Sequence, residues 1–457
     1  MSEDTIAAIS TAAGRGGVAI IRVSGDEALS IAEKMFRPTG KTAVRNFVSY
    51  HMYPGNILAE HFTDFGLCVY FKSPCSYTGE DVVEFHCHGG TEIANGILKR
   101  TFTFGARPAE AGEFTKRAFL NGKMSLSAAE GVIDMINAQS ESMIKAGYSL
   151  YRNELGREVQ SVQDRLTTLL ASIEVDIDYP EEDLEHSLPD LVNVKEDLYT
   201  LYKRIDELKN SYDIFGKKVK NGISVAIVGK PNSGKSSLLN AILGYNKAIV
   251  SDVAGTTRDV VEGVIEIKGL QFNLYDTAGM RESKDVIERI GVEKAERIMD
   301  EADVVLHVVD GSNPPNEEDA ALSKTAAKKK RLLHLTILNK SDLFSEKKIK
   351  KFTSDAPALE ISAKENKNIE TLLETLYSAA ANSYNFNNRF VVEERHYKAL
   401  KIASERLQKA YEKCGGAPMD MLTVDIAEAW RSLGEITGET ANEEIINEIF
   451  SKFCVGK

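Results

Sequence analysis

The sequence predicts a multidomain protein: an α/β domain, then a helical bundle that carries a second, inserted α/β domain with a mostly parallel, doubly wound sheet. Three observations indicate this. Residues 1–120 mix strand-like apolar runs with glycines, residues 121–218 and 381–457 show helical periodicity, and residues 219–380 alternate short apolar strands with helices. Helical sequence on both sides of 219–380 favours insertion into one bundle. Two separate helical domains would also fit the pattern.

Composition narrows the class of protein. The chain has 457 residues, a net charge of −12 and five cysteines. Contact with a nucleic acid must therefore use a local basic patch, because the surface as a whole is acidic. The odd, sparse cysteines fit a reducing compartment. The start of the chain lacks a signal-peptide pattern, and no apolar run approaches the roughly 18 residues of a membrane span. We expect a cytoplasmic protein without a membrane span.

The first domain and the helical part are predicted from different spacings of apolar residues along the sequence. Residues 18–23 and 66–71 are apolar runs typical of strands, with glycines between them. Two later series of apolar residues recur at steps of three and four, which places each series on one stripe of a long helix. We interpret both stripes as packing between antiparallel helices. The stripes are Leu155, Val159, Val162, Leu166, Leu169 and Ile173, then Leu191, Val194, Leu198, Leu201, Ile205 and Leu208.

The most informative motif lies in the middle of the chain, where residues 229–236 read GKPNSGKS. This is a phosphate-binding loop: Gly229 and Gly234 allow backbone N–H groups to surround phosphate oxygens, Lys235 reaches the terminal phosphates, and the Ser236 hydroxyl can bind Mg²⁺. An apolar strand precedes the loop and a helical run follows it, so the helix N-terminus faces the anion.

Four further segments follow in the order that a GTPase requires. A threonine within residues 255–259 can complete the Mg²⁺ shell. Asp276 can hold Mg²⁺ through water, and the N–H of Gly279 can sense the γ-phosphate. Residues 339–342 read NKSD, whose carboxylate can accept hydrogen bonds from N1–H and the N2 amine of guanine, which adenine does not offer. Residues 362–364 supply a backbone N–H to the guanine oxygen, so the sequence predicts GTP as ligand.

Two positions bear on hydrolysis. Met280 stands where Ras-like proteins carry the glutamine that orients water, and its thioether is a poor hydrogen-bonding group. Another group must orient the water. Asn232 offers a neutral oxygen to a monovalent cation, so K⁺ could replace an arginine finger; ordinary loop chemistry is the alternative. Arg258 fits either a finger from the same chain or a solvated charge.

Motifs along the whole chain together resemble one family. They are the nucleotide motifs 229–236, 255–259 and 276–279, the final FCVGK at 453–457, and three earlier segments, 14–22, 77–84 and 113–123. This set resembles the MnmE (TrmE) family of tRNA-modification GTPases. The nucleotide motifs alone are shared with other GTPases, such as the ribosome-assembly protein Der, so the early segments and the final residues discriminate.

The resemblance implies a folate-binding N-terminal domain that forms a homodimer, a helical domain and an inserted GTPase domain. It implies a partner, the FAD-containing protein MnmG (GidA), in a heterotetramer. Together they would use a one-carbon unit of 5-formyltetrahydrofolate, or another tetrahydrofolate derivative, to install a carboxymethylaminomethyl or aminomethyl group at position 5 of the wobble uridine of certain tRNAs.

The resemblance also implies residue roles. Folate contacts fall on Arg22, Glu84, Lys123 and Lys457. Ligands of K⁺ fall on Asn232, Ser251, Val253 and Thr256, and ligands of Mg²⁺ on Ser236 and Thr257. Glu288 would orient the hydrolytic water, beside Lys235 and Cys454 as further catalytic candidates. With the motifs above, the expected GTP contacts are Asn232, Ser233, Gly234, Lys235, Ser236, Ser237, Ser251, Asp252, Val253, Ala254, Gly255, Thr256, Thr257, Asp276, Thr277, Ala278, Gly279, Asn339, Lys340, Asp342, Ser362, Ala363 and Lys364.

Some readings stay open. Cys454 could be a reactive thiol or a small buried hydrophobe beside Phe453. The HCH triplet at 86–88 invites a metal interpretation but has no second ligand pair at zinc spacing. The basic run 328–331 is typical of a solvated helix end, with RNA contact as the alternative. The competing function is a switch GTPase that scaffolds ribosome or stress-response assembly, with the N-terminal domain as a docking module.

Overall fold

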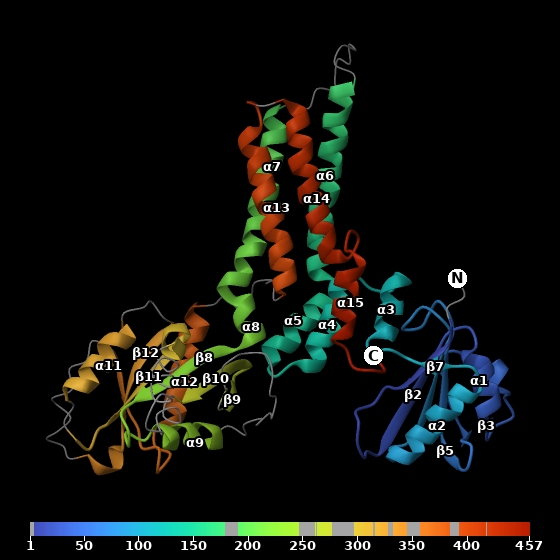
Figure 1. Cartoon of the computed structure of the whole chain (residues 1–457), viewed down its shortest axis with the longest axis horizontal. Helices are drawn as coiled ribbons and strands as arrows, with labels where there is room; N and C mark the ends of the chain where they lie inside the picture. Colours follow the sequence, from blue (N-terminus) through green and yellow to red (C-terminus); the bar gives the residue numbers. More distant parts are fainter. Residues whose placement is uncertain are drawn as a thin grey trace, which may run out of the picture. The chain divides into compact units, whose positions relative to one another are not determined.

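The computed structural model confirms the predicted fold class and divides into two compact units (Figure 1). The first unit comprises residues 1–136, 147–201 and 405–457, and the second comprises residues 137–146 and 202–404. The three-domain boundaries expected from the sequence stay a prediction. The structure describes residues 4–178, 191–245, 261, 263–276, 297–313, 316–327, 332–344, 357–383, 393–416 and 418–457.

The first unit begins with a seven-stranded sheet in the order β3-β4-β5-β6-β2-β1-β7. Its neighbours pair antiparallel except β1 and β7, which are parallel. The predicted strands 18–23 and 66–71 are confirmed within β2 and β5. The strands are β1 (Ile6–Ile9), β2 (Val18–Ser24), β3 (Phe36–Pro38), β4 (Met52–Leu58), β5 (Thr63–Phe71), β6 (Val82–His88) and β7 (Arg107–Pro108).

The two faces of this sheet are covered differently. Helices α1 (Ala28–Met35) and α2 (Thr91–Thr103) cover one face, where Ile21 and Phe85 belong to the main apolar core. Because side chains alternate along a strand, the neighbouring residues of β2 and β6 point to the opposite face. A smaller apolar cluster lies there, formed by Ile6 and Ala8 with Ala109 and Phe114, and Tyr77 packs against it.

Residues near position 455 complete this domain. Helices α3 (Glu113–Leu120) and α15 (Glu443–Ser451) frame a cluster that includes Phe450 and Phe453. Val455 forms an antiparallel bridge with Ala111. A Cβ on Gly456, whose φ is +99°, would lie 2.2 Å from the carbonyl oxygen of Ile9, so only glycine fits. The segment 453–456 is therefore fitted against the end of β1.

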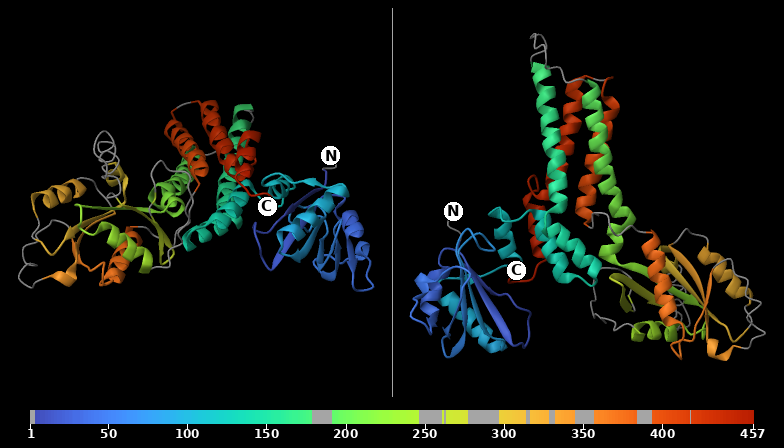
Figure 2. Two further views of the ribbon diagram at one scale, coloured as in Figure 1. Left: turned by 60° about the horizontal axis from the view of Figure 1, so that its bottom comes forward. Right: turned by 180° about the vertical axis from the view of Figure 1, so that it is seen from behind.

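Long helices form the rest of the first unit, although parts of α5, α7 and α13 belong to the second unit. Helices α6 and α14 run side by side (Figure 2). Gln163 of α6 donates to the carbonyl of Trp430 in α14, and the rings of Tyr199 and Tyr411 join α7 to α13. The first predicted stripe is buried throughout, and in the second Val194, Leu198, Leu201 and Ile205 are buried, which confirms helix packing. The helices of this part of the chain are α4 (Leu126–Asn137), α5 (Glu141–Tyr151), α6 (Glu154–Asp178), α7 (Leu191–Ser211), α13 (Glu394–Lys413) and α14 (Met419–Thr437).

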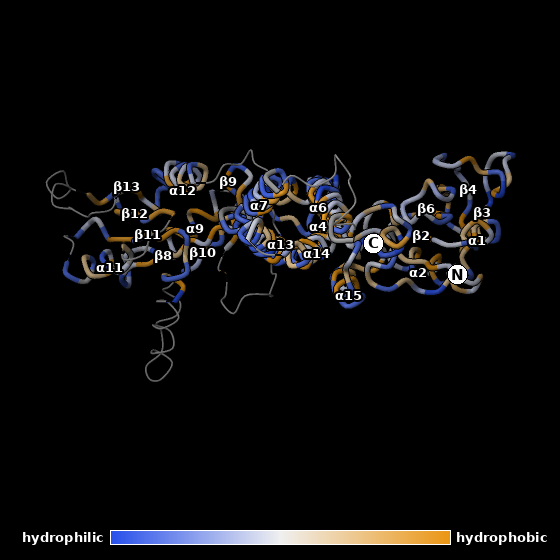
Figure 3. The backbone as a smooth tube through the Cα atoms, turned by 90° about the horizontal axis from the view of Figure 1, so that it is seen from above, coloured by the Kyte–Doolittle hydropathy of each residue, from blue (hydrophilic) through white to orange (hydrophobic). Residues whose placement is uncertain are grey.

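The second unit contains a six-stranded sheet in the order β13-β12-β11-β8-β10-β9. All neighbours are parallel except β9 with β10, which confirms the mostly parallel sheet that the alternating pattern predicts. Hydrophobic residues concentrate in the central strands β8 and β11 (Figure 3), which helices cover on both faces. The strands are β8 (Ile223–Gly229), β9 (Gly263–Ile267), β10 (Leu270–Asp276), β11 (Val304–Asp310), β12 (Leu333–Asn339) and β13 (Ala358–Glu360). The main helices are α9 (Lys235–Tyr245), α11 (Glu317–Ala327) and α12 (Ile369–Ser383), with α8 (Lys217–Asn221) leading into β8.

The carboxyl ends of β8, β10, β11 and β12 meet at one edge, because these strands are parallel. They end at Gly229, Asp276, Asp310 and Asn339 respectively. Ligands of open α/β sheets bind at this edge. Within the described ranges, no helix combines the length and the apolar character needed to cross a membrane.

Candidate functional site

The phosphate loop follows β8 and is packed so closely that its glycines are required. A Cβ on Gly229 would lie 2.3 Å from the carbonyl oxygen of Val308 in β11. A Cβ on Gly234, whose φ is +94°, would lie 2.2 Å from Nδ2 of Asn339. The loop is thus wedged between two neighbouring strand ends, and only glycine leaves room for its backbone.

Lys235 and Ser236, the first two residues of α9, lie where they can bind a phosphate and a cation. Nζ of Lys235 is buried and donates to the carbonyl of Lys230 at 2.7 Å. The hydroxyl of Ser236 donates to Oδ2 of Asp276, 2.9 Å away. A hydroxyl and a buried carboxylate at this separation form an oxygen donor set of the kind that Mg²⁺ prefers, so these residues fit the ion that the motif implies.

Asn339, at the end of β12, connects the phosphate loop to the expected base-recognition loops. Its Nδ2 donates to the carbonyl of Ser233 at 3.1 Å. Its Oδ1 accepts from the backbone N–H of Lys340 at 2.8 Å and of Ala363 at 3.1 Å. The side chain is 2% exposed, so these bonds are shielded from water. One buried amide therefore fixes three segments that are distant in sequence.

The carboxylate expected to read guanine is also oriented. The Ser362 hydroxyl donates to Oδ1 of Asp342 at 2.7 Å, and the Ser362 hydroxyl in turn accepts from the N–H of Glu365. The hydrogen bond from Ser362 lowers the pKa of the Asp342 carboxyl, and the charges of Lys364 and Lys340 act in the same direction. An ionised, exposed carboxylate is the acceptor that two guanine donors require.

Lys340 ties the two halves of this site together. Its Nζ donates to the carbonyl of Asn232 at 3.0 Å and to Oδ2 of Asp310 at 2.6 Å. Asn232 itself has φ +61° and is exposed. Ser237 is exposed on the first turn of α9. The structure thus gathers the described phosphate, base and Mg²⁺ residues at one edge.

The remaining nucleotide predictions lie outside the described residues. They are Ser251, Asp252, Val253, Ala254, Gly255, Thr256, Thr257, Arg258, Thr277, Ala278, Gly279, Met280, Glu288 and the basic run 328–331. The K⁺ set and the water-orienting role therefore stay predictions.

A second polar site lies on the N-terminal sheet, on the face opposite α1 and α2. Arg22 of β2 is the direct cross-strand partner of Glu84 of β6, and its Nε donates to Oε1 of Glu84 at 2.8 Å. Oε2 of Glu84 is 3.1 Å from Nε2 of His86. Burial opposes ionisation of Glu84, but the hydrogen bond from His86 and the charge and hydrogen bond of Arg22 outweigh it and keep the pKa below its usual value.

Aromatic rings line this pair. The guanidinium carbon of Arg22 lies 5.5 Å from the ring centre of Tyr77 and 5.6 Å from that of Phe114. In the described part of the chain, neither terminal nitrogen of Arg22 has a hydrogen-bond partner. A guanidinium fork with unused donors between two rings suits a planar ligand that carries acceptor oxygens or nitrogens, so the geometry fits a folate ring system.

The other predicted folate residues make separate contacts. Lys123 donates from Nζ to the carbonyl of Pro74 at 2.8 Å, and its side chain lies beside Gly79. The backbone N–H of Lys457 bonds the carbonyl of Cys454 at 3.4 Å. Cys454 is exposed while Phe453 is buried, so the interpretation of Cys454 as a buried hydrophobe is wrong. Its catalytic role stays a prediction.

The HCH triplet does not converge on a metal. His86 bonds Glu84, whereas His88 bonds Asp64, with Nδ1 2.7 Å from Oδ1. Cys87 points to the other face, where its Sγ–H donates to the carbonyl of Ala19, and burial raises the pKa of its thiol to about 11. Within the described ranges no group of three or more His, Cys, Asp or Glu side chains could hold a metal ion.

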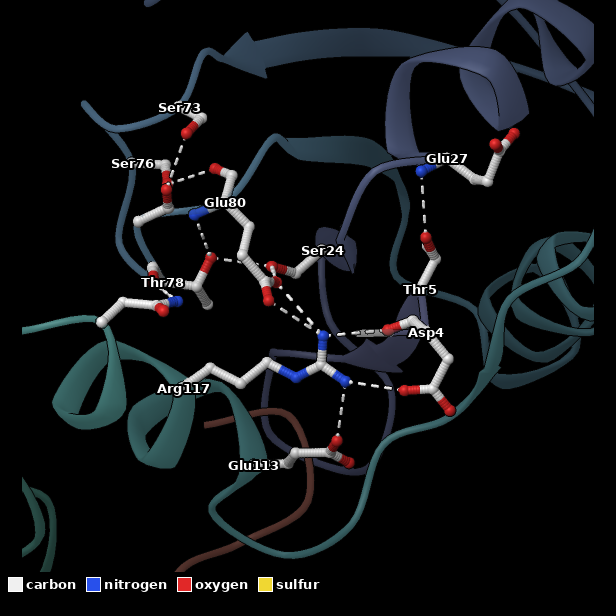
Figure 4. Close-up of polar contacts among 12 residues, drawn as sticks. Asp4, Thr5, Ser24, Glu27, Ser73, Ser76, Thr78, Glu80, Glu113 and Arg117 are labelled. Carbon is white, nitrogen blue, oxygen red and sulfur yellow. Dashed lines mark hydrogen bonds and ion pairs between the residues drawn. The ribbon is translucent and has the colours of Figure 1, made fainter. Parts of the chain in front are cut away.

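A partly buried ion network, not predicted from the sequence, lies beside this second site (Figure 4). Arg117 of α3 donates to the carboxylates of Glu80, Glu113 and Asp4 at 3.0–3.2 Å and to the carbonyl of Asp4 at 2.9 Å. Glu80 also accepts from Ser24 at 2.6 Å. The segments 77–84 and 113–123 carry Glu80, Glu113 and Arg117, and the opposite signs of these charges were the available signal. The network fixes the loop that bears Tyr77.

The fold and the first site define a P-loop guanine-nucleotide-binding protein, and comparison with known proteins identifies its family. The model "GTP-binding protein TrmE N-terminus" matches residues 5–123, and "MnmE helical domain" matches residues 126–454. The chain belongs to the MnmE (TrmE) family.

Full-length relatives are similar along the whole chain. The "tRNA modification GTPase MnmE" of Clostridioides difficile is 40% identical over 474 residues, which cover 100% of this chain and 99% of the relative. That of Acetivibrio thermocellus is 41% identical over 465 residues, with the same coverage of 100% and 99%. Among solved structures, Aquifex aeolicus Era is 31% identical over 40% of this chain and 66% of its own, with a TM-score of 0.29. The G domain of T. maritima FeoB is 24% identical over 35% and 98%, with a TM-score of 0.26.

Proposed function

We propose that this chain is a GTP-hydrolysing enzyme of tRNA modification, the activity that the names of its relatives state. The observation that carries the proposal is Asn339, which binds the phosphate loop through Ser233 and the base-recognition loop through Ala363. A nucleoside triphosphate with a guanine base would contact both the phosphate loop and the base-recognition loop, which Asn339 joins. We also propose that the protein acts in the cytoplasm.

The described residues have distinct tasks in this proposal. Lys235 exchanges its bond to the Lys230 carbonyl for the terminal phosphates, while the loop N–H groups bind the same oxygens. Asp342 accepts from the two donors of guanine, and Ser362 keeps its carboxylate oriented. Bound at Ser236 and Thr257, with Asp276 acting through water, Mg²⁺ would neutralise charge on the β- and γ-phosphates.

Hydrolysis needs a group that orients the attacking water and a positive charge that stabilises the transition state. The thioether of Met280 can supply neither. We assign orientation of the water to Glu288. At Asn232, Ser251, Val253 and Thr256, K⁺ would supply the charge that an arginine finger gives elsewhere. We infer that the GTPase domains of two copies associate when GTP and K⁺ are bound, and that this association accelerates hydrolysis.

The second site supports a one-carbon role. We propose that Arg22 and Glu84, with Lys123 and Lys457, bind 5-formyltetrahydrofolate or a related derivative, which would supply a one-carbon unit. The N-terminal domain forms the homodimer, and the FAD-containing MnmG joins it in a heterotetramer. The product is a carboxymethylaminomethyl or aminomethyl group at position 5 of the wobble uridine, with Cys454 as candidate thiol.

Two assays test the core of the proposal. GTP turnover by the purified chain is expected to be several times faster in K⁺ than in Na⁺ at equal ionic strength; equal rates in the two salts would end the K⁺ model. A strain that lacks the gene is expected to lose the wobble-uridine modification by mass spectrometry, and wild-type protein but not Lys235→Ala restores it.

A binding assay separates the alternative function. A scaffolding switch GTPase would bind GTP but not folate, whereas the proposed enzyme binds 5-formyltetrahydrofolate and loses it in Arg22→Met. Gln163→Met, which alters a polar side chain between α6 and α14, is the control that keeps folate binding. Wild-type protein that binds GTP and shows no folate binding would favour the scaffold.

A further inference from the structure

The first half of the phosphate loop is anchored to helix α11 by the side chain of Lys230. Its Nζ donates to Oδ2 of Asp319 at 2.8 Å and also contacts Oδ1 of Asn316. The side chain of Asp319 is 9% exposed and that of Lys230 21% exposed. A largely desolvated ion pair of this kind is screened by solvent far less than a surface pair.

The anchor on α11 is itself rigid. The N–H of Asp319 donates to Oδ1 of Asn316 at 3.2 Å, and the N–H of Asn316 donates to Oδ2 of Asp319 at 3.1 Å. This reciprocal pair forms a capping box at the start of α11, which satisfies two backbone donors of the first turn. Lys230 therefore binds a carboxylate whose position is already fixed.

The backbone of Lys230 contacts the reactive part of the loop. Its carbonyl accepts the Nζ of Lys235, the group that reaches the phosphates. The loop's later carbonyls, those of Asn232 and Ser233, are held instead by Lys340 and Asn339 of the guanine motif. The anchor at Asp319 thus holds the one described end of the loop that the guanine motif leaves unbound.

We propose that Lys230 is a positioning residue for GTP, which preorganises the phosphate loop by its ion pair with Asp319 and so sets the position of Lys235. This rests on the proposed GTPase function. Before nucleotide arrives, the ion pair limits the conformations of the loop; after it arrives, the nucleotide itself holds the loop. Preorganisation of this kind raises affinity by reducing the ordering that binding requires.

The test uses the full chain and the variant Lys230→Met, which keeps the aliphatic stem and removes only the charge. Binding of a fluorescent GTP analogue and of GDP is expected to weaken by roughly tenfold, with kcat at saturating GTP within about twofold of wild type. Asp319→Asn is expected to give the same pattern, and Lys230→Arg to restore most of the affinity. The double variant should be no worse than either single one, since both remove one interaction.

A matched control is Lys268→Met in the same unit, which removes an ion pair with Glu374. The side chains of Lys268 and Glu374 are 52% and 50% exposed, so this pair lies at the surface. The control variant is expected to leave both affinity and kcat unchanged. Unchanged affinity in Lys230→Met, or strictly additive losses in the double variant, would overturn the inference. A fall of kcat with unchanged affinity would overturn it too. Failure of the wild-type chain to bind GTP would instead remove the proposed function itself.

Discussion

The side-chain amide of Asn339 donates to the backbone carbonyl of Ser233 at 3.1 Å, and so joins the end of β12 to the phosphate loop beside it. The same amide accepts from Ala363, so the phosphate and base sites share one buried side chain. Displacement of either loop therefore disturbs the other. This connection explains why nucleotide affinity should depend on a residue that the phosphates need not touch.

Replacement of Asn339 by alanine should weaken both stability and binding. It leaves the carbonyl of Ser233 and the N–H of Ala363 without this partner in a buried site, which costs about 1–3 kcal/mol of stability. We expect a lower melting temperature and at least about tenfold weaker GTP binding by calorimetry. The control is Asn442→Ala, which removes the cap of α15 in the other unit and should leave GTP affinity unchanged. Wild-type affinity in Asn339→Ala would contradict the connection.

Replacement of Asp342 by asparagine should change the preferred base. Guanine presents two donors to the carboxylate, whereas an amide presents one acceptor and one donor. Xanthine carries a carbonyl where guanine carries the amine, so it matches the amide. We expect GTP affinity to fall by about tenfold to a hundredfold and affinity for xanthosine triphosphate to rise. A competition assay with both nucleotides measures this, and an unchanged preference would place the base elsewhere.

The buried side chain of His307 should make the stability of the second unit depend on pH. Its ring is fully buried in β11, and neither ring nitrogen has a hydrogen-bond partner within the described ranges. Burial lowers the pKa from 6.5 to about 4, against a smaller opposing effect of Asp319; His334 and Lys230 lower it further. The unfolded chain binds a proton that the folded chain excludes, so stability is complete above about pH 6.5 and falls as pH drops toward 4.

Between about pH 6.5 and pH 4, the free energy of unfolding of the second unit is expected to fall by about 3 kcal/mol. Hydrogen exchange of β11 at several pH values measures it, with His307→Leu as the comparison. The difference in free energy between wild type and variant should change between pH 7 and pH 4.5. A difference that is independent of pH would show that the ring is protonated in the folded state.

Removal of Arg117 should destabilise the N-terminal sheet. Arg117→Met leaves the carboxylates of Glu80 and Glu113, which lie in a largely buried setting, without this guanidinium. We expect a loss of about 3 kcal/mol at pH 7, read as faster hydrogen exchange in β1 and β7. Arg165→Met is the control, because its pair with Asp197 is far more exposed and should contribute little.

The loss should also depend on pH in a defined direction. Burial opposes ionisation of Glu113, but its bonds to Arg107, the backbone of Glu110 and Arg117 lower its pKa below the usual value. The stabilising contribution is therefore present above the ordinary glutamate pKa and is lost as pH falls through the lowered value. Arg117→Met and wild type should converge in acid, and an equal difference at pH 7 and pH 3 would exclude the ionic explanation.

The local patterns predicted much of the fold because they reflect burial. Strands β8, β11 and β12 are short apolar runs in a parallel sheet, and the stripes of α6 and α7 face other helices. The antiparallel edge strand β9 (Gly263–Ile267) was not predicted, because an edge strand with exposed positions has a weak pattern. How helices from both ends of the chain pack depends on contacts between distant residues, which periodicity does not report.

The two sites differed in how far the sequence could define them. The guanine and phosphate motifs are local, so short stretches of sequence are enough to identify their residues. Arg22 and Glu84 were predicted as site residues from the family resemblance alone, although their opposite charges within two apolar strands were a visible signal. The bond between Lys230 and Asp319 joins residues from separate strand–helix repeats, and any lysine and aspartate of the chain could have been paired equally well. Only the register of the sheet selects this pair.

The bridge between Ala111 and Val455 has a consequence for synthesis of the protein. Ribosomes add about 5–20 residues each second, so the N-terminal sheet emerges on the order of tens of seconds before its bridging partner. During that interval the nascent sheet lacks the cover that Phe453 and Gly456 later give to α3 and β1. Packing of this part of the N-terminal domain is therefore completed only after residues 453–456 have been synthesised.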